Sequence, residues 1–450
     1  MSYSVAGIAA DRIGRRPVLC IWLVLLFFAG TTLVFAHSVP VFAALRFLLS
    51  VGAAGVVVAS HVLLFEVTGS RYRATYCAIS VASATFAAAV YSELIYVCIR
   101  NWHIEQVAYM IPSCGMIVAV YLMEESPCWL MSVSEMRYAE SVLVGRPAST
   151  TSSEHVQAPP LPSEDELNRQ NEQLALQQEP EGAIVSDHAR SLAHTLSRTY
   201  LTANYVDAPA EVRVSDLLSK HTLRQRSVVI FGCWFLVFGA FAHFTTTNVM
   251  RTSEATRIAL VLLRLPCVVA DVYAITRAGR RLSLAFSMLA LSVVATALSV
   301  VELFGGASEK LSAALVVSGL LVFDVSAITA FAFSAELYPT VLRGTALGCC
   351  YMSGRLGALV APLVSEIPSP PLRSAAYAIA AAMLLLLSTM AFALPETRQL
   401  PPSNTVQGML AMEEKWLLYS PLRVARDGGK RRRSRTTSLG RAKRRLLVPP

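Results

Sequence analysis

Among the charged residues inside long apolar stretches of this sequence, four could contact a substrate: Arg264, Asp271, Asp324 and Arg355. A charge within a membrane is costly unless it is paired or faces water, so each is a candidate for function. The Arg355 guanidinium, about midway along residues 344–364, could form a bidentate pair with a carboxylate substrate or join an internal ion pair. Asp324 could pair with Arg264 or with Arg355. Arg264 and Asp271 are seven residues apart and should point the same way on one helix.

A short cationic turn occurs twice, once in each half of the chain. The charged and glycine positions are Asp11, Arg12, Gly14, Arg15 and Arg16 in the first copy, and Gly279, Arg280 and Arg281 in the second. Asp11 can face a helix N-terminus, and Arg15 and Arg16 can pair with acids such as Glu66. Thr276 stands where the first copy has Asp11, so we expect a weaker contact there. The alternative is that these arginines only anchor the topology.

A second signature repeats in the same order as the turn. Glu66 is followed seven residues later by Arg73, and Glu336 is followed seven residues later by Arg343. In each half, two apolar stretches separate the turn from this signature and two more follow it. Two parallel halves of this kind are an architecture of membrane transporters. We expect both signatures to act as conformational switches between the halves.

The composition indicates a membrane protein, because 54% of the 450 residues are hydrophobic and only 15% are charged. The net charge of +9 comes from one segment, since residues 421–450 hold eleven Lys or Arg and one Asp. Such a basic tail favours attraction to anionic lipid over nucleic-acid binding. The sequence shows no phosphate-binding loop, catalytic triad or zinc-ligand spacing. We therefore expect no enzyme activity, no cofactor and no metal.

Ten stretches are apolar and long enough to cross a bilayer as helices, which predicts an all-α membrane protein. They are residues 17–36, 40–65, 75–98, 107–123, 227–249, 257–275, 282–303, 311–333, 344–364 and 374–394.

Four segments follow from these stretches. Residues 1–123 form an N-terminal transmembrane bundle, and 226–398 form a C-terminal bundle of six helices. Residues 124–225, rich in Ser, Pro, Glu and Gln, are expected to be a largely disordered linker, and 399–450 a basic tail. The basic loops fall on one side, so the positive-inside rule predicts that both termini are cytoplasmic.

The repeat also predicts a gap at the start of the chain. Two stretches precede the turn in the second half, but only residues 1–10 precede it in the first. Equivalent halves would require two more helices there, so the arrangement is 4+6 where 6+6 is expected. We interpret this as a fragment, a truncated gene model or a short isoform, in preference to a genuine ten-helix protein.

Several motifs resemble the major facilitator superfamily, and within it the organic cation, organic anion and carnitine transporters. The motifs are residues 11–16, similar to the loop between helices 2 and 3; Glu125-Ser126-Pro127-Cys128-Trp129-Leu130, with Cys128 where the family has Arg; Glu336 to Arg343; and Leu394-Pro395-Glu396-Thr397. The resemblance implies a twelve-helix bundle that moves small organic ions by alternating access in the plasma membrane. Sugar transporters share some of these motifs, but their double Gln and Gly-Pro-x-Pro runs are missing here, so a sugar-porter-like facilitator ranks second.

The same resemblance bears on the substrate. The Arg355 position is basic in many anion and carnitine carriers of the family, and Arg264 lies where the family commonly has an acid. A basic residue at each of these two positions favours anionic substrates. Phe241 replaces a Tyr that lines the substrate path, and its ring could stack on an organic ion. A non-transporting membrane protein that sequesters a full-length partner stays open as the alternative.

Overall fold

The computed structural model describes most of the chain, and every regular element in the described part is a helix. The described residues are 1–69, 72–99, 101–132, 216–219, 221–248, 254–304 and 309–397. Most of the predicted linker and all of the predicted tail lie outside these residues.

The first half contains five long or medium helices and two short elements. They are α1 (Ser2–Ile13), α2 (Arg15–Thr32), the 3₁₀ turn η1 (Leu33–Phe35), α3 (Val39–Val67), α4 (Arg73–Cys98), α5 (Trp102–Leu122) and α6 (Pro127–Ser132). The second half begins with a short helix and continues with six long ones. They are α10 (Asp216–Ser219), α11 (His221–Asn248), α12 (Glu254–Ala278), α13 (Arg280–Phe304), α14 (Glu309–Leu337), α15 (Thr340–Ser365) and α16 (Pro370–Ala391).

All ten predicted spans coincide with long helices, α2 to α5 and α11 to α16. Eight of these helices are long and apolar enough to cross a membrane; α4 and α12 are the two that are not among the eight. The all-helical membrane architecture is confirmed, while the count of ten spans stays a prediction.

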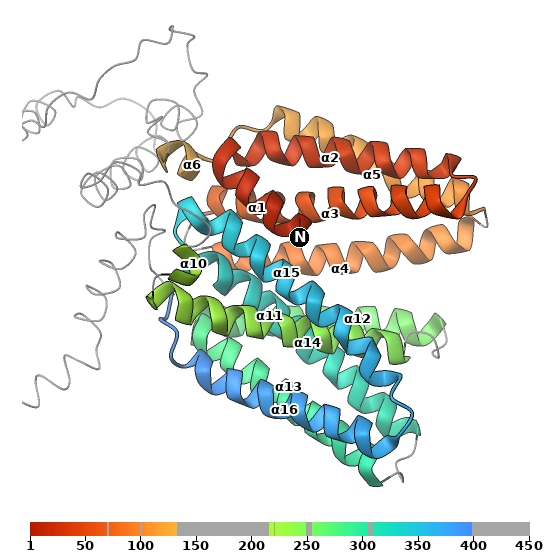
Figure 1. Ribbon diagram of the computed structural model, residues 1–450, viewed down its shortest axis with the longest axis vertical. Coiled ribbons are helices and arrows are strands. Elements are labelled where there is room, and N and C mark those ends of the chain that lie inside the picture. Colours follow the sequence, from red (N-terminus) through yellow and green to blue (C-terminus); the bar gives the residue numbers. More distant parts are fainter. Residues whose placement is uncertain are drawn as a thin grey trace, which may run out of the picture.

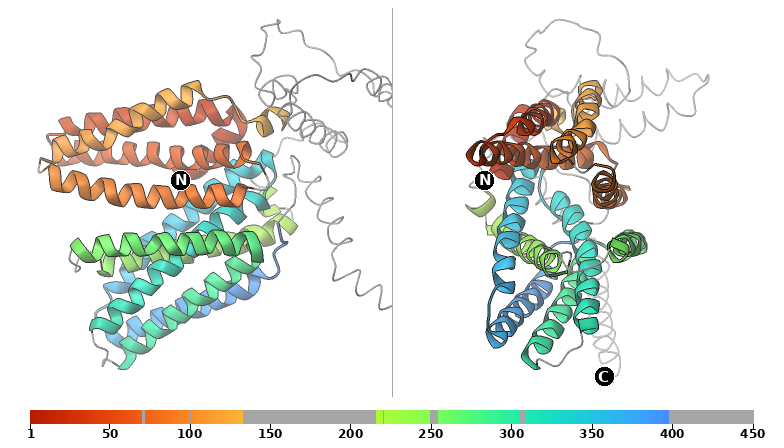
Figure 2. Two further views of the ribbon diagram at one scale, coloured as in Figure 1. Left: turned by 180° about the vertical axis from the view of Figure 1, so that it is seen from behind. Right: turned by 90° about the vertical axis from the view of Figure 1, so that its right-hand side faces the viewer.

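The helices form two groups that correspond to the two halves of the sequence (Figure 1). The groups lie close together at the end that carries α6 and α10, and they diverge toward the opposite end; the view from behind shows the same arrangement (Figure 2). We call these the closed end and the outer end. Among the helix pairs that join the halves, α1 packs against α15, which we call the first seam, and α4 packs against α12, which we call the second seam. Helix α4 also packs against α14, and α3 against α15.

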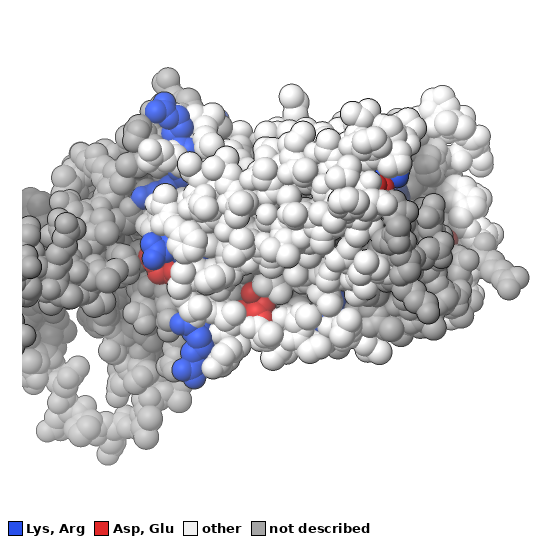
Figure 3. Space-filling view, turned by 90° about the horizontal axis from the view of Figure 1, so that it is seen from below, with Lys and Arg blue, Asp and Glu red and all other residues white. Residues whose placement is uncertain are grey.

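Apolar side chains cover the outside of the bundle. Phe28, Leu359 and Ile379 are each at least 60% exposed. In the view from below, most of the coloured charged side chains lie at the closed end, and the other described atoms of this face are mostly uncharged (Figure 3). Such a surface is stable in lipid, because contact with hydrocarbon avoids the free-energy cost of exposing apolar side chains to water.

Candidate functional site

The first cationic turn is a glycine kink between α1 and α2. Gly14 has a φ of 117°, a conformation that side chains with a Cβ rarely adopt. The Glu125 carboxylate, which follows α5, accepts hydrogen bonds from the backbone N–H groups of Arg15 (3.1 Å) and Arg16 (3.2 Å). The carboxylate therefore caps α2 and complements its positive N-terminal dipole. A Cβ at Gly14 would lie 2.6 Å from a Glu125 oxygen. Both the positive φ angle and this close contact therefore favour glycine at position 14.

The second copy is built in the same way. Gly279 has a φ of 96°, and Glu396 accepts hydrogen bonds from the N–H groups of Arg280 (3.1 Å) and Arg281 (3.2 Å). The duplication therefore includes a distant capping glutamate in each half. Both glutamates lie within the family motifs, but their capping role was not predicted from the sequence, because each lies several helices further along the chain than its turn.

A buried ion cluster fills the closed end between the halves, consisting of Asp11, Arg15, Glu66 and Arg343. Arg15 donates two hydrogen bonds of 3.0 Å to Glu66, and Arg343 from the other half donates one of 2.9 Å to the same carboxylate. Arg15 also donates to the Thr340 carbonyl at 2.9 Å. The side chain of Glu66 is fully buried, so these charges neutralise one another away from water.

The Asp11 carboxylate binds the N-terminal part of α15, which belongs to the opposite half. Its carboxylate accepts hydrogen bonds from the N–H of Gly344 (3.0 Å) and from the N–H and hydroxyl of Thr345 (2.7 and 2.8 Å). Burial raises the pKa of Asp11 to about 6, although Arg15 and the bonds from Thr345 lower it. The side chain is therefore mainly a carboxylate at pH 7 and stabilises the N-terminus of α15.

The two arginines of the second signature have matching backbone contacts. Arg343 donates to the carbonyls of Ala335 (3.0 Å) and Tyr338 (3.3 Å), and Arg73 donates to those of Phe65 (3.1 Å) and Thr68 (3.2 Å). The acceptors of one arginine occupy the same places in the repeat as the acceptors of the other.

Each repeated glutamate binds partners in its own half and also interacts with an arginine of the other half. Glu66 accepts a hydrogen bond of 2.5 Å from Ser126. Glu336 pairs with Arg280 at 3.1 Å, accepts a hydrogen bond from Thr397, and its charge is stabilised by Arg73. The sequence repeat is thus a structural repeat down to single hydrogen bonds.

The remaining turn residues have separate environments. Arg12 is exposed. Arg16 donates to the carbonyls of Val120 (3.4 Å) and Tyr121 (2.5 Å) at the end of α5. The prediction that Arg15 pairs with Glu66 is confirmed; the guanidinium of Arg16 bonds to backbone oxygens instead. Thr276 donates its hydroxyl to the Val272 carbonyl of its own helix, at 2.8 Å.

The charges inside the apolar helices fall into two places. Arg264 of α12 and Asp324 of α14 form an ion pair of 2.9 Å, which is one of the two pairings predicted for Asp324. Asp271 is buried and accepts a hydrogen bond of 3.3 Å from Thr329. These three residues lie together within the second half.

Arg355 lies apart from them. It is exposed, donates a hydrogen bond of 3.0 Å to the Tyr3 hydroxyl of the first half, and lies 5.8 Å from the centre of that ring. With a rise of 1.5 Å per residue, Arg355 lies about 18 Å along α15 from Arg343. It is therefore well separated from the ion cluster and near the middle of its helix.

An aromatic cluster joins the halves between these two levels. The Tyr3 and Tyr351 rings stack at 5.4 Å, His61 stacks on Phe331 at 5.2 Å, and the Tyr351 hydroxyl is 3.0 Å from His61 Nδ1. Trp234 lies 4.6 Å from Phe331. Phe241, the aromatic residue that the sequence singled out, stacks on Phe323 at 4.4 Å on the same side of the second half.

Two family models match this chain. The model of the Major Facilitator Superfamily matches residues 2–270, and the model of sugar (and other) transporters matches residues 196–402. This chain belongs to the Major Facilitator Superfamily. The two-bundle fold, the repeated turns and the family motifs of this facilitator all agree with that membership.

Similar proteins include members of solute carrier family 22, which confirms the sequence resemblance. Human solute carrier family 22 member 12 is 28% identical over 413 residues, which are 90% of this chain and 66% of the relative. Member 7 from Bos taurus is 27% identical over 409 residues, covering 90% of this chain and 67% of the relative. The facilitator thus spans about two-thirds of the length of these relatives.

A solved structure shares the fold. The proton:xylose symporter XylE bound to 6-bromo-6-deoxy-D-glucose aligns with a TM-score of 0.62, with 16% identity, over 91% of this chain and 86% of that chain. These relatives are solute carriers and a symporter, not enzymes, in agreement with the sequence prediction.

The aromatic cluster is a second part of the site that the sequence did not predict, besides the capping roles of Glu125 and Glu396. His61, Tyr351 and Phe331 lie within predicted spans, where aromatic residues are ordinary on lipid-facing and on buried surfaces alike. A histidine within an apolar span was the available signal, because a polar ring needs a partner there. Tyr3 had no such signal.

Proposed function

We propose that this facilitator moves small organic ions across a membrane by alternating access, with the closed end as one of its two gates. The proposal rests on the buried ion cluster between the halves. Glu66 binds Arg343 across the interface, and Asp11 caps the opposite half, so opening this end requires breaking several charge-assisted contacts together. The divergence of the helices toward the outer end supports an outward-open arrangement (Figure 2).

The proposed substrate contact is Arg355. Its guanidinium is exposed beside the stacked rings of Tyr3 and Tyr351, about midway along α15 and between the halves. A fixed cation next to aromatic faces favours a flat organic carboxylate, because the guanidinium can bind both oxygens while the rings stack on the apolar body. This juxtaposition is the single observation that carries the preference for anions. Arg264, whose charge is balanced by Asp324, adds no free cation that would compete with it.

The orientation belongs to the same proposal. The two cationic turns lie at the closed end, together with α6 and α10, from which the linker starts and at which it ends. By the positive-inside rule this end faces the cytoplasm, in the plasma membrane, and the positive charge of the sequence beyond residue 398 favours attraction to anionic lipid.

Uptake into liposomes containing the purified chain tests the function. We expect a labelled aromatic carboxylate to enter faster than a labelled aromatic quaternary amine or a labelled hexose. Arg355→Ala should reduce carboxylate uptake about tenfold or more, the loss expected for one charge-assisted contact, and Arg355→Lys should restore part of it. Arg224→Ala, which removes an exposed arginine at the closed end of α11, serves as the control.

Two results would contradict the proposal. Folded protein that moves none of the three labelled compounds would exclude transport by this chain and favour the sequestering alternative. Equal carboxylate uptake by the wild type and Arg355→Ala would exclude Arg355 as the substrate contact.

A further inference from the structure

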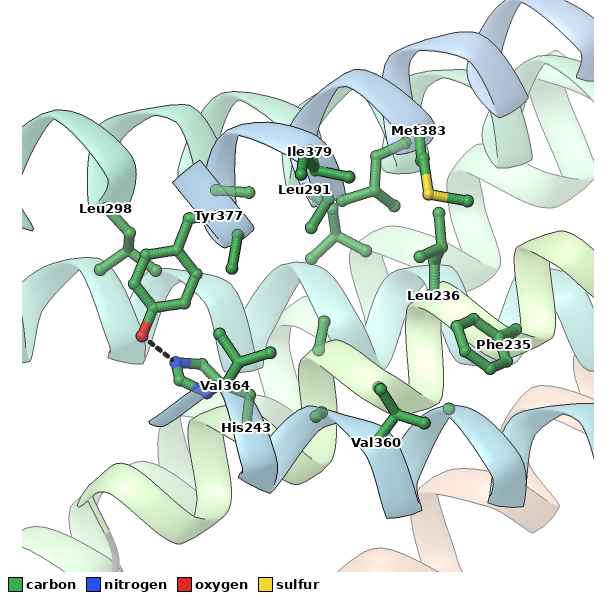
Figure 4. Close-up of a pocket in the computed structure, with 18 of the residues that line it drawn as sticks. Phe235, Leu236, His243, Leu291, Leu298, Val360, Val364, Tyr377, Ile379 and Met383 are labelled. Carbon is green, nitrogen blue, oxygen red and sulfur yellow. Dashed lines mark hydrogen bonds between the residues drawn. The ribbon is translucent and has the colours of Figure 1, made fainter. Parts of the chain in front are cut away.

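A second site lies inside the second half, away from the interface of the two halves. Residues of α11, α13, α15 and α16 enclose a cavity of about 310 Å³ (Figure 4). Helices α13 and α16 lie on the side of the molecule farthest from the first half (Figure 1). We propose that this cavity binds a membrane lipid with a single hydroxyl group, of the sterol class, which enters from the bilayer and is not the transported substrate.

The mouth of the cavity faces the membrane. Three lining residues are exposed on the outside of the bundle: Val360 of α15 (47%), and Ile379 (63%) and Met383 (47%) of α16. The opening therefore lies between α15 and α16, where the bilayer would be in contact with it. A ligand that uses this mouth must come from the hydrocarbon region, which selects for an apolar body.

The polar part of the cavity lies at one end. The Tyr377 hydroxyl is 2.9 Å from His243 Nε2, and both residues lie within about two turns of the outer ends of their helices. Leu291, Phe235 and Met383 line the part that extends toward the middle of the membrane (Figure 4). The site thus has the polarity of a membrane amphiphile that stands upright, with its polar group near the interface.

The chemistry of the polar end favours a hydroxyl group over a charged head group. None of the residues that line the cavity is an Asp, Glu, Lys or Arg. The nearby Arg373 and Glu302 form an ion pair of 2.9 Å, so their charges are already balanced. A Tyr hydroxyl can donate one hydrogen bond and accept others, so a lipid hydroxyl can join the Tyr377–His243 pair without bringing a charge.

The size of the cavity favours a compact ligand. Small-molecule sites commonly have volumes of about 300–1,000 Å³, and this cavity lies at the lower end of that range. A rigid ring system loses little conformational freedom when part of it enters such a volume through the open mouth, while two flexible acyl chains would lose more.

Photolabelling in lipid nanodiscs tests this inference with the full chain. A photoreactive cholesterol analogue should give adducts on the peptides that contain Val360, Ile379 and Met383, and excess cholesterol should displace it. Ala376→Leu fills the cavity from α16 and should lower labelling about tenfold. Ala375→Leu adds the same side chain at the next, exposed position and should leave labelling unchanged. Tyr377→Phe should lower labelling several-fold.

Three outcomes would overturn the inference. The adducts could be spread evenly over all lipid-facing helices, or the Ala376→Leu variant could be labelled as strongly as the wild type while having the same unfolding midpoint. The third is that a fatty acid or a phospholipid displaces the photoreactive analogue and cholesterol does not. If Ala376→Leu does not fold, Tyr377→Phe decides, because it removes only one oxygen. Arg355→Ala should label normally, which separates this site from the proposed transport function.

Discussion

The two seams that join the halves have equivalent positions in the repeat but different construction. In the first seam, backbones meet directly: a Cβ at Gly7 would lie 2.1 Å from the Gly344 carbonyl oxygen, and one at Gly348 would lie 2.4 Å from the Tyr3 carbonyl oxygen. In the second seam, side chains separate the helices. Ala78 of α4 and Ile275 of α12 share a buried cluster with Ile328 of α14, and Val272 packs against it.

Alignment of the two cationic turns makes this difference specific. Gly7 then corresponds to Val272, and Asp11 corresponds to Thr276. The first seam therefore has both the close backbone contact and the carboxylate cap on α15, while the second has a branched side chain and a hydroxyl bonded to its own helix. The two seams therefore differ at two equivalent positions, and only the first has a direct backbone contact at these positions. We expect the first seam to hold the closed end more strongly.

Removing Glu66 should have the largest effect. Glu66→Ala leaves Arg15 and Arg343 buried without their shared carboxylate, and breaking a buried ion pair in this way costs about 3–5 kcal/mol. The measurement is the denaturant midpoint of the purified protein in detergent, with Glu366→Ala, at an exposed position, as the control. Removing Arg343 as well should recover part of the loss; strictly additive losses would show that Glu66 and Arg343 act independently.

Widening the first seam should have the next largest effect. Gly7→Val forces the backbones of α1 and α15 apart, and overpacking of this kind costs about 1–3 kcal/mol. Val272→Ala, at the equivalent position of the second seam, removes two methyl groups from a partly buried side chain and should cost about 1 kcal/mol. Unfolding midpoints compare the two variants. A greater loss for Val272→Ala would reverse the assignment of the tight seam.

We expect the smallest effect from the contact of Asp11 with α15, which the second seam lacks. Asp11→Asn keeps an acceptor oxygen but removes the negative charge beside the N-terminal part of α15, and it should favour the open form of this end by about 1–2 kcal/mol, a factor of about 5–30 in population. Thr276→Ala should stay within about 0.5 kcal/mol. The readout is the rate at which a water-soluble maleimide labels a cysteine placed at the buried Thr340. Equal rates for the two variants would show that the acid does not distinguish the seams.

Local sequence patterns predicted much of this structure. The apolar stretches correctly predicted the long helices, because backbone hydrogen bonds must be satisfied within each helix in lipid. The pairs Arg15–Glu66 and Arg264–Asp324 also followed from charge, since buried charges need partners.

The contacts that were missed depend on the three-dimensional arrangement of distant segments. Glu125 meets its turn only after α5 has returned to the closed end, and no spacing in the sequence encodes that meeting. The stack of Tyr3 on Tyr351 depends on how α1 crosses α15, which follows from the fit of three glycines and not from any periodic pattern.

The capping glutamates have a consequence for biosynthesis. Glu125 follows α5, the last long helix of the first half, and Glu396 follows α16, the last of the second. A ribosome makes Gly14 long before Glu125, so the amide groups that open α2 wait for their acceptor until the rest of that half has been translated. Each half therefore completes its cationic turn only after its last long helix has been made, and a chain that stops before Glu125 or Glu396 would leave the start of α2 or α13 without its capping carboxylate.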